Sequence, residues 1–219
     1  DGQTLRIGWQ GREWTRDLAL VGDFQAENVG VAAGLAIATG LDPETVMAAL
    51  PHLATVRGRM ERAGRRANGA AVYVDYAHTP DALAAALKAL RPHCAGSLVV
   101  VFGAGGDRDT GKRPLMGEAA AAHADQVIVT DDNPRSEDPA AIRAAVMAGC
   151  PRASNIAGRA EAVLAGVDAL GAPGDCLLIA GKGHEQGQEI AGEMHPFDDV
   201  AQARTAIAVL DGEDGEGAR

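Results

Sequence analysis

Short apolar runs alternate with longer alanine-rich stretches along most of the chain after residue 70. The apolar runs are continuous, as is typical of strands buried on both faces of a parallel sheet. They lie at 70–75, 97–103, 126–130 and 176–181. Helical patterns follow or precede them at 80–90, 115–124, 140–148, 159–170 and 200–210. This order predicts a doubly wound α/β domain with a mostly parallel sheet covered by helices on both faces.

The first part of the chain has a different pattern. Residues 1–20 predict two strands with a turn around Gln10-Gly11, and 27–39 and 43–50 predict two helices. A basic stretch at 57–66 reads as a connector. The chain thus changes its organisation before the α/β pattern begins.

This change of pattern divides the chain into three expected segments. Because no strand precedes it to complete a sheet, 1–56 is expected to be the end of another domain. The α/β domain is expected to span 57–210. The acidic, glycine-rich end, 211–219, is expected to be disordered. A further strand, with an antiparallel direction left open, is expected at 188–194.

Composition narrows the functional classes. The formal net charge of −10 disfavours a nucleic-acid binder, because such proteins need basic surface. It does not exclude a small anion held by a few arginines. The three cysteines form no CxxC pair, which favours buried thiols in a reducing cytosol. No signal peptide or membrane-length apolar run is present, and the six histidines show no metal-ligand spacing. We therefore expect a cytoplasmic protein without membrane insertion or a structural metal.

Polar, glycine-rich segments follow the predicted strands. In an open α/β sheet, ligands bind beyond the carboxyl ends of the strands. Ordinary turn chemistry would explain any one of these segments, but four at one edge favour a ligand pocket. The segments are "DYAHTPD" (75–81), "GAGGDRDTGKRP" (103–114), "TDDNPR" (130–135) and "AGKGHE" (180–185).

The segment 103–114 is similar to two nucleotide-binding motifs but matches neither completely. Gly106 to Lys112 fits GxxxxGK, but Arg113 replaces the Ser or Thr that would bind magnesium. Gly103, Gly105 and Gly106 suggest a dinucleotide fingerprint, but Arg108 stands in place of its third glycine. What remains is a flexible backbone that brings basic side chains to the edge of the sheet.

The charges expected at this edge favour an amino-acid ligand. Arg108, Arg135 and Glu185 would supply two cations and one anion. Such a set suits an amino acid with an extra carboxylate, bound by guanidinium–carboxylate pairs and by an acid for the ammonium. Residues without an assigned role at this stage are His78, Lys112, Lys182 and His184.

These motifs together resemble the Mur ligases of peptidoglycan synthesis, most closely the members that add meso-diaminopimelate. The resemblance covers nearly all of the chain except its ends. It rests on "GDFQAENVGVAAGLA", "GRME", "VDYAHTPDAL", "VFGAGGDRDTGKRPLMG", "VTDDNPRSEDP", "GRAEA" and "IAGKGHEQGQEI". It implies three domains: one for the UDP-sugar, a central ATPase, and a Rossmann-like carboxyl-terminal domain for the incoming amino acid. This chain would hold the end of the second and all of the third.

The resemblance also implies roles for individual residues. Gln25 departs from the asparagine that is usual in the family at its position. Positions matching diaminopimelate contacts are Arg108, Asp132, Asn133, Pro134, Arg135, Gly181 and Glu185. Positions matching ATP contacts are Asn28, Arg59 and Asp75.

The reaction implied by the resemblance joins meso-diaminopimelate to UDP-N-acetylmuramoyl-dipeptide. ATP phosphorylates the terminal glutamate carboxylate, and the amine attacks the acyl phosphate. The family's phosphate loop, its Mg²⁺ ligands and its modified lysine would lie upstream. No catalytic residue or metal ligand is therefore expected in this chain, which should be inactive alone. Alternatives are a lysine-adding ligase, a folate-polyglutamylating ligase and a non-catalytic amino-acid-binding module.

Overall fold

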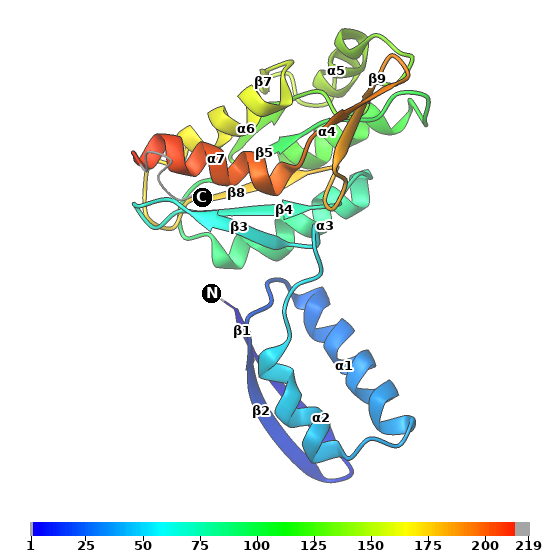
Figure 1. The fold of residues 1–219 in the computed structure, drawn as a ribbon, viewed down its shortest axis with the longest axis vertical. Helices are drawn as coiled ribbons and strands as arrows, with labels where there is room; N and C mark the ends of the chain where they lie inside the picture. The colour runs from blue at the N-terminus through cyan, green and yellow to red at the C-terminus, as the bar shows by residue number, and fades with distance from the viewer. Residues whose placement is uncertain (1, 213–219) are drawn as a thin grey trace. The chain divides into compact units, whose positions relative to one another are not determined.

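The structure is a computed structural model that describes residues 2–212, and the chain divides into two compact units. The first unit is Asp1–Val56 and the second is Arg57–Arg219. Both contain helices and strands (Figure 1). Each unit is described by itself below.

The first unit is a hairpin with two helices. Strands β1 (Gln3–Trp9) and β2 (Arg12–Leu18) pair antiparallel, and helices α1 (Asp23–Ala38) and α2 (Pro43–Ala49) follow. A short 3-10 turn, η1 (Leu50–His52), ends the unit's regular structure. The predicted turn is confirmed, and both of its residues, Gln10 and Gly11, have positive φ as in a type I′ turn. Helix α1 begins at Asp23, four residues before the predicted start.

The core of this first unit is small. Buried residues of β2 and both helices form one apolar cluster, which includes Trp14, Leu18, Val29 and Met47, and partly buried residues of β1 pack against it. The opposite side of α1 is apolar but uncovered, since Val31 and Leu35 are 64% and 63% exposed. The unit therefore carries apolar helix surface that its own residues do not bury.

The second unit contains a six-stranded sheet with the order β3-β4-β8-β5-β6-β7. All neighbours pair parallel except β3 with β4. The central strands are fully buried and rich in valine, isoleucine and leucine, as a sheet covered on both faces requires. The strands are β3 (Glu61–Arg65), β4 (Ala71–Asp75), β5 (Leu98–Phe102), β6 (Gln126–Val129), β7 (Ser154–Asn155) and β8 (Cys176–Ala180).

Helices cover both faces of this sheet. Helices α6 and α7 pack together on one face, where they share a core cluster with β4, β5 and β8, and α3 lies on the other (Figure 1). The predicted α/β fold with a mostly parallel sheet is confirmed. The helices are α3 (Pro80–Leu90), α4 (Lys112–His123), α5 (Pro139–Met147), α6 (Arg159–Asp168) and α7 (Asp199–Asp211), with a 3-10 turn η2 (Arg91–His93).

Two predicted elements near the sheet were wrong. The basic stretch 57–66 contains edge strand β3 rather than a plain connector. Charged side chains are tolerated on an edge strand, where they discourage pairing with other chains. The single strand expected at 188–194 is a hairpin, β9 (Gly187–Ile190) and β10 (Glu193–Pro196), in a sheet of its own. Its turn residues Ala191 and Gly192 both have positive φ.

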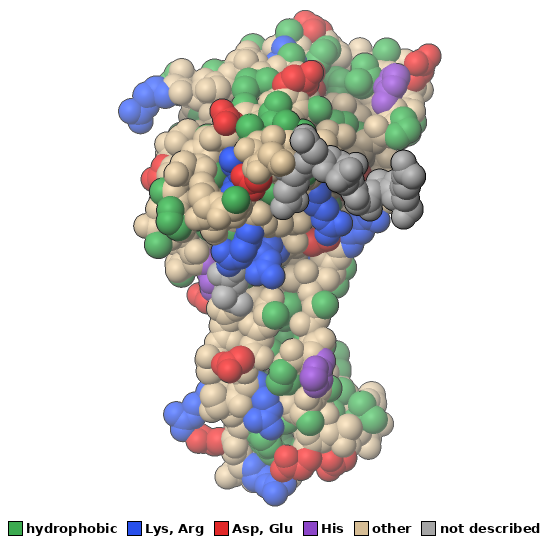
Figure 2. Space-filling model, turned by 60° about the vertical axis from the view of Figure 1, so that its left-hand side comes forward, with side chains coloured by type: hydrophobic (Ala, Val, Ile, Leu, Met, Phe, Trp, Pro, Cys, Tyr) green, Lys and Arg blue, Asp and Glu red, His purple; other side chains and the backbone are tan. Residues whose placement is uncertain are grey.

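The surface mixes charges of both signs. On the face shown in Figure 2, Asp and Glu side chains are interspersed with those of Lys and Arg. No helix among the described residues is both long enough and apolar enough to cross a membrane.

The expected disordered tail at 211–219 was wrong at its first residue. Asp211 ends helix α7, and its carboxylate accepts hydrogen bonds from Arg66 Nε at 2.7 Å and from the backbone N–H of Ala67 at 2.7 Å. Gly212 caps the helix in a left-handed conformation, with φ 74°. The remaining residues of the predicted tail, 213–219, lie outside the described part of the chain.

Stability should depend on pH through Asp211. The hydrogen bond from Arg66 lowers the pKa of the Asp211 carboxyl. Because the folded pKa lies below the unfolded value of about 3.9, the contact stabilises the fold at neutral pH and is lost as pH falls through the folded pKa. Asp211→Asn should lower Tm at pH 7, and the difference from wild type should shrink below about pH 4. Circular dichroism melts at several pH values measure this, with the exposed Asp168→Asn as control. A difference that does not change with pH would contradict it.

Candidate functional site

The strand register aligns the four polar loops. Asp75 pairs with Ala180, Ala180 with Phe102, and Phe102 with Val129. These residues end β4, β8, β5 and β6, so the following loops start side by side at the carboxyl edge of the sheet. The sequence prediction of one shared edge for these loops is confirmed.

The loops after β5 and β6 are in backbone contact. The N–H of Gly106 donates to the carbonyl of Asn133 at 2.8 Å. A Cβ on Gly106 would lie 1.9 Å from the carbonyl oxygen of Pro134, so this position admits only glycine without moving the backbone. The Asp-Asn-Pro-Arg loop is therefore held against the glycine-rich loop, and the two form one wall of the site.

A buried lysine links the loops after β6 and β8. Lys182 Nζ donates to Asn133 Oδ1 at 2.9 Å and to Glu185 Oε2 at 3.0 Å, and its side chain is 0% exposed. Asn133 Nδ2 donates to the same Glu185 oxygen at 2.9 Å. These three side chains form a closed polar cluster in which Glu185, 33% exposed, faces solvent. The sequence left Lys182 without a role, and its burial was not foreseen.

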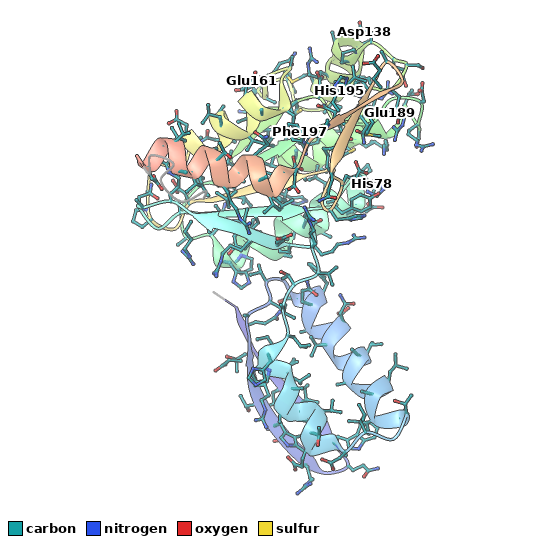
Figure 3. The ribbon with its side chains drawn as sticks, viewed as in Figure 1. His78, Asp138, Glu161, Glu189, His195 and Phe197 are labelled. Carbon is teal, nitrogen blue, oxygen red and sulfur yellow. The ribbon has the colours of Figure 1, made fainter. Side chains whose placement is uncertain are left out.

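Arg135 adopts a backbone conformation that is rare for an arginine. Its φ is +52°, and it pairs with the hairpin: its N–H donates to the carbonyl of Glu189 at 3.1 Å, and its own carbonyl accepts from Ala191 at 2.8 Å. Its guanidinium Nη1 donates to the carbonyl of Gly106 at 2.8 Å. The β9–β10 hairpin, labelled at Glu189 and His195 in Figure 3, thus packs on the Asp-Asn-Pro-Arg loop.

Arg108 lies near Arg135 but is less fixed. Both arginines border Gly105: a Cβ there would be 2.9 Å from Arg135 Nη1 and 3.9 Å from Arg108 Cγ. Arg108 is exposed. Within the described part of the chain, Glu185 contacts Lys182 and Asn133 rather than either arginine. The charged side chains at this edge therefore include two that the sequence did not single out: Lys182, which pairs with Glu185, and Glu189, which pairs with Arg135.

Asp132 points into the protein. It is 8% exposed, its Oδ1 accepts from the N–H of Asn133 at 2.8 Å, and its Oδ2 is buried without a hydrogen-bond partner among the described residues. The nearest cation is Arg159, whose Nη1 lies 3.7 Å from Oδ2. A Cβ on Gly181 would come within 2.6 Å of this oxygen, so glycine lets the loop after β8 pass close to Asp132.

Arg159 and Asp199 form a fully buried ion pair that sequence reasoning missed. Arg159, the first residue of α6, donates from Nε and Nη2 to the two oxygens of Asp199, the first residue of α7, at 2.8 and 2.7 Å. It also donates to the carbonyls of Asp131 at 3.3 Å and Ala180 at 3.0 Å. Burial alone would lower the pKa of Arg159, but the Asp199 carboxylate raises it on balance. The pair therefore ties two loops of the site to two helices.

The positions expected to contact ATP are divided between the units. Asn28 lies exposed on α1 of the first unit. In the second unit, Asp75 is buried and accepts from the N–H groups of Met60 at 2.7 Å and Ala77 at 2.8 Å. Burial raises the pKa of Asp75 despite these hydrogen bonds. The Arg59 guanidinium lies 4.8 Å from the centre of the Tyr76 ring.

Two of the remaining unassigned residues, His78 and His184, flank the ring of Tyr76. The rings of His78 and His184 lie 4.6 and 5.0 Å from that of Tyr76. Lys112 Nζ donates to the carbonyl of His78 at 2.9 Å, which joins the loop after β4 to the start of α4. Burial lowers the pKa of Lys112. These contacts hold the loops after β4, β5 and β8 together.

A cavity of about 650 Å³ lies elsewhere, near β6 and β7. Its walls include Cys150, Arg152 and Ile156, and none of its lining residues belongs to the four loops. Charged residues and hydrogen-bonded loops, rather than enclosed volume, therefore mark the candidate site.

Fold and candidate site together define a class: an α/β domain whose charged, polar loops meet at the carboxyl edge of a mostly parallel sheet. A family model described as "Mur ligase, glutamate ligase domain" matches residues 58–183. The chain belongs to the Mur ligase family, and the resemblance seen in the sequence is confirmed.

Individual relatives agree with this assignment. The UDP-N-acetylmuramoyl-L-alanyl-D-glutamate--2,6-diaminopimelate ligase of Caulobacter vibrioides is 56% identical over 210 residues, which are 96% of this chain and 43% of that protein. A solved structure of a ligase with the same name is 42% identical, with a TM-score of 0.70 over 94% of this chain and 43% of that one. Folylpolyglutamate synthase from Mycobacterium tuberculosis, 24% identical with a TM-score of 0.64 over 97% of this chain and 46% of that one, shares the fold. The chain spans less than half the length of the relatives it matches.

Proposed function

We propose that this chain is the amino-acid-binding part of an ATP-dependent ligase that adds meso-diaminopimelate to UDP-N-acetylmuramoyl-L-alanyl-D-glutamate. The observation that carries the proposal is the hydrogen-bonded cluster of Asn133, Lys182 and Glu185 beside Arg135. The names of relatives that are 56% identical over almost all of the chain support it.

The proposed roles follow from the chemistry of each group. Glu185 has one carboxylate oxygen engaged by Asn133 and Lys182, so the other is placed to accept from an ammonium group of the ligand. Arg135 binds the carboxylate at the distal end of the amino acid, and Arg108 adds positive charge beside it. Further ligand contacts proposed from the resemblance are Asp132, Asn133, Pro134 and Gly181.

The chain's contribution to the reaction is positioning. Holding the attacking amine next to an activated carboxylate supplies several kcal/mol of the barrier, since two reactants then meet without losing further freedom. ATP supplies the phosphoryl group that activates this carboxylate. Asn28, Arg59 and Asp75 are proposed to face ATP. We propose no Mg²⁺ ligand in this chain, because the resemblance places the family's metal ligands upstream of it.

The environment proposed for the protein is the cytoplasm, with small molecules rather than nucleic acid as ligands. The net charge of −10 supports the second of these two proposals, because a phosphate backbone is bound through excess positive charge.

Ligand titration tests the proposal. Meso-diaminopimelate should shift the NMR signals of Asn133, Arg135 and Glu185 in the 219-residue chain, and lysine should bind at least about tenfold more weakly because it lacks the carboxylate for Arg135. The chain alone should release no phosphate from ATP in the presence of both other substrates.

Other outcomes would favour other functions. Equal affinity for lysine would favour a lysine-adding ligase, and binding of folyl-glutamate would favour a folate ligase. Sub-micromolar binding without ligase activity in the longer protein would favour a binding module.

A further inference from the structure

Glu189, on strand β9 and labelled in Figure 3, forms an ion pair with the guanidinium group of Arg135. Its Oε2 is 3.2 Å from Arg135 Nε, with the two side chains 37% and 22% exposed. The backbone bridge between Arg135 and the hairpin fixes this arrangement, because the carbonyl of Glu189 accepts from the N–H of Arg135. The N–H of Glu189 also donates to Asn133 Oδ1 at 3.0 Å. Glu189 therefore contacts the Asp-Asn-Pro-Arg loop through both its backbone and its side chain.

A second acid whose charge interacts with that of Arg135, Asp107, is already engaged by Ser136. Asp107 accepts from the hydroxyl of Ser136 at 2.7 Å and from its N–H at 3.1 Å. The hydrogen bonds from Ser136, followed by the charges of Arg135 and Arg108, lower the pKa of Asp107. Glu189 is thus the carboxylate that contacts the Arg135 guanidinium directly.

A carboxylate that binds arginine through two parallel hydrogen bonds needs one edge of the guanidinium, either Nε with Nη2 or Nη1 with Nη2. An acceptor already lies beside two of these nitrogens. A Glu189 oxygen is 3.2 Å from Nε in an ion pair, and the carbonyl of Gly106 accepts from Nη1 at 2.8 Å. The Gly106 carbonyl belongs to a backbone packed against Pro134 and does not move freely. The Glu189 side chain, by contrast, is 37% exposed, so rotation about its own bonds is enough to carry its carboxylate away from Arg135.

We infer that Glu189 is a specificity-determining residue: an internal carboxylate that occupies Arg135 in the free protein and that the ligand's distal carboxylate displaces. This inference rests on the proposed function of Arg135. Glu189 keeps the arginine side chain in place when the site is empty. It also competes with every ligand that uses Arg135, because both partners are anions and one edge accepts one carboxylate.

The effect of Glu189 on affinity should differ between ligands with and without a distal carboxylate. A ligand with a distal carboxylate has to break the Arg135–Glu189 pair, whereas lysine leaves it intact. Glu189 therefore weakens binding of meso-diaminopimelate and leaves that of lysine nearly unchanged. Removing its charge should increase the preference for the dicarboxylic amino acid.

Glu189→Gln tests this inference, with Glu193→Gln on the same hairpin as the matched control. Glu193 is 81% exposed and its partner is His195, so its replacement changes the hairpin's charge equally without touching Arg135. Titration of the 219-residue chain should give a dissociation constant for meso-diaminopimelate about two- to fivefold lower in Glu189→Gln, the size of an exposed ion pair. The constant for lysine should change less than about twofold, and Glu193→Gln should match wild type for both.

A second measurement needs no ligand. The NMR signal of the Arg135 Nε–H should shift in Glu189→Gln and stay in place in Glu193→Gln. Weaker or unchanged binding of meso-diaminopimelate in Glu189→Gln would overturn the inference while leaving the proposed function standing. A failure of wild type and both variants to bind meso-diaminopimelate would overturn the proposed function and the inference with it, whatever the Nε–H signal does.

Discussion

Arg135→Ala is expected to weaken binding of meso-diaminopimelate by about ten- to a hundredfold. The change removes hydrogen bonds between charged groups, which contribute roughly 1.5–3 kcal/mol. Alanine is a better choice than glycine, because the φ of +52° costs alanine about as much as arginine and glycine would relieve it. Affinity for lysine should change little, so discrimination between the two amino acids should fall by a similar factor.

Two comparisons separate binding from folding in this test. Arg135→Lys should restore only part of the affinity, since an ammonium group lacks the planar pair of donors. Arg152→Ala removes an exposed arginine near the opposite edge of the sheet and should leave affinity unchanged. Titrations with both amino acids measure these constants, and in the longer ligase the KM for ATP should stay near wild type. A change of less than about twofold in Arg135→Ala would make Arg135 a turn residue and nothing more.

Asp199→Ala should destabilise the second unit by about 3–5 kcal/mol. Removing one partner of a buried ion pair leaves the other charge buried and uncompensated, here the fully buried Arg159. Replacing both, as Arg159→Met with Asp199→Leu, should recover much of the loss, because an apolar pair of similar volume carries no unpaired charge. The site should nevertheless bind more weakly in the double variant, since Arg159 also donates to the backbone of Asp131 and Ala180.

The stability measurement for these variants has to follow the unfolding of the second unit. Both tryptophans, Trp9 and Trp14, belong to the first unit, so their fluorescence does not follow the unfolding of the second. Urea unfolding followed by hydrogen exchange of β4, β5 and β8 gives the free energy needed. If Asp199→Ala and the double variant lost stability equally, the uncompensated charge of Arg159 would not be the cause.

The sequence was sufficient to predict the central sheet, because β4, β5, β6 and β8 are continuous apolar runs whose burial their composition demands. It did not reveal β3 or the β9–β10 hairpin. Those strands are short, charged and largely exposed, and their pairing depends on partners that only the fold supplies.

The site shows the same division. The position of the polar loops at the strand ends was predictable from the alternation of strands and helices. The resemblance to the Mur ligases then indicated which residues in these loops to consider. The buried Lys182 and the pair of Arg159 with Asp199 were not predictable, since 40 residues separate the partners of that pair and charged residues are usually exposed. Glu189 was missed because nothing local distinguishes it from a solvated acid. Its meaning comes from the neighbouring Arg135.

The position of β8 decides when a newly made chain can bind a ligand. β8 is the last strand of the sheet to be synthesised, yet it lies between β4 and β5. A nascent chain that ends before Cys176 can pair β3 with β4 and β5 with β6, but it has no strand to join the two halves. Because domains fold as units during synthesis, such a chain keeps its early loops apart on the ribosome. Ligand binding by ribosome-bound chains should therefore begin abruptly once β8 and the loop after it, through Glu185, have emerged from the exit tunnel.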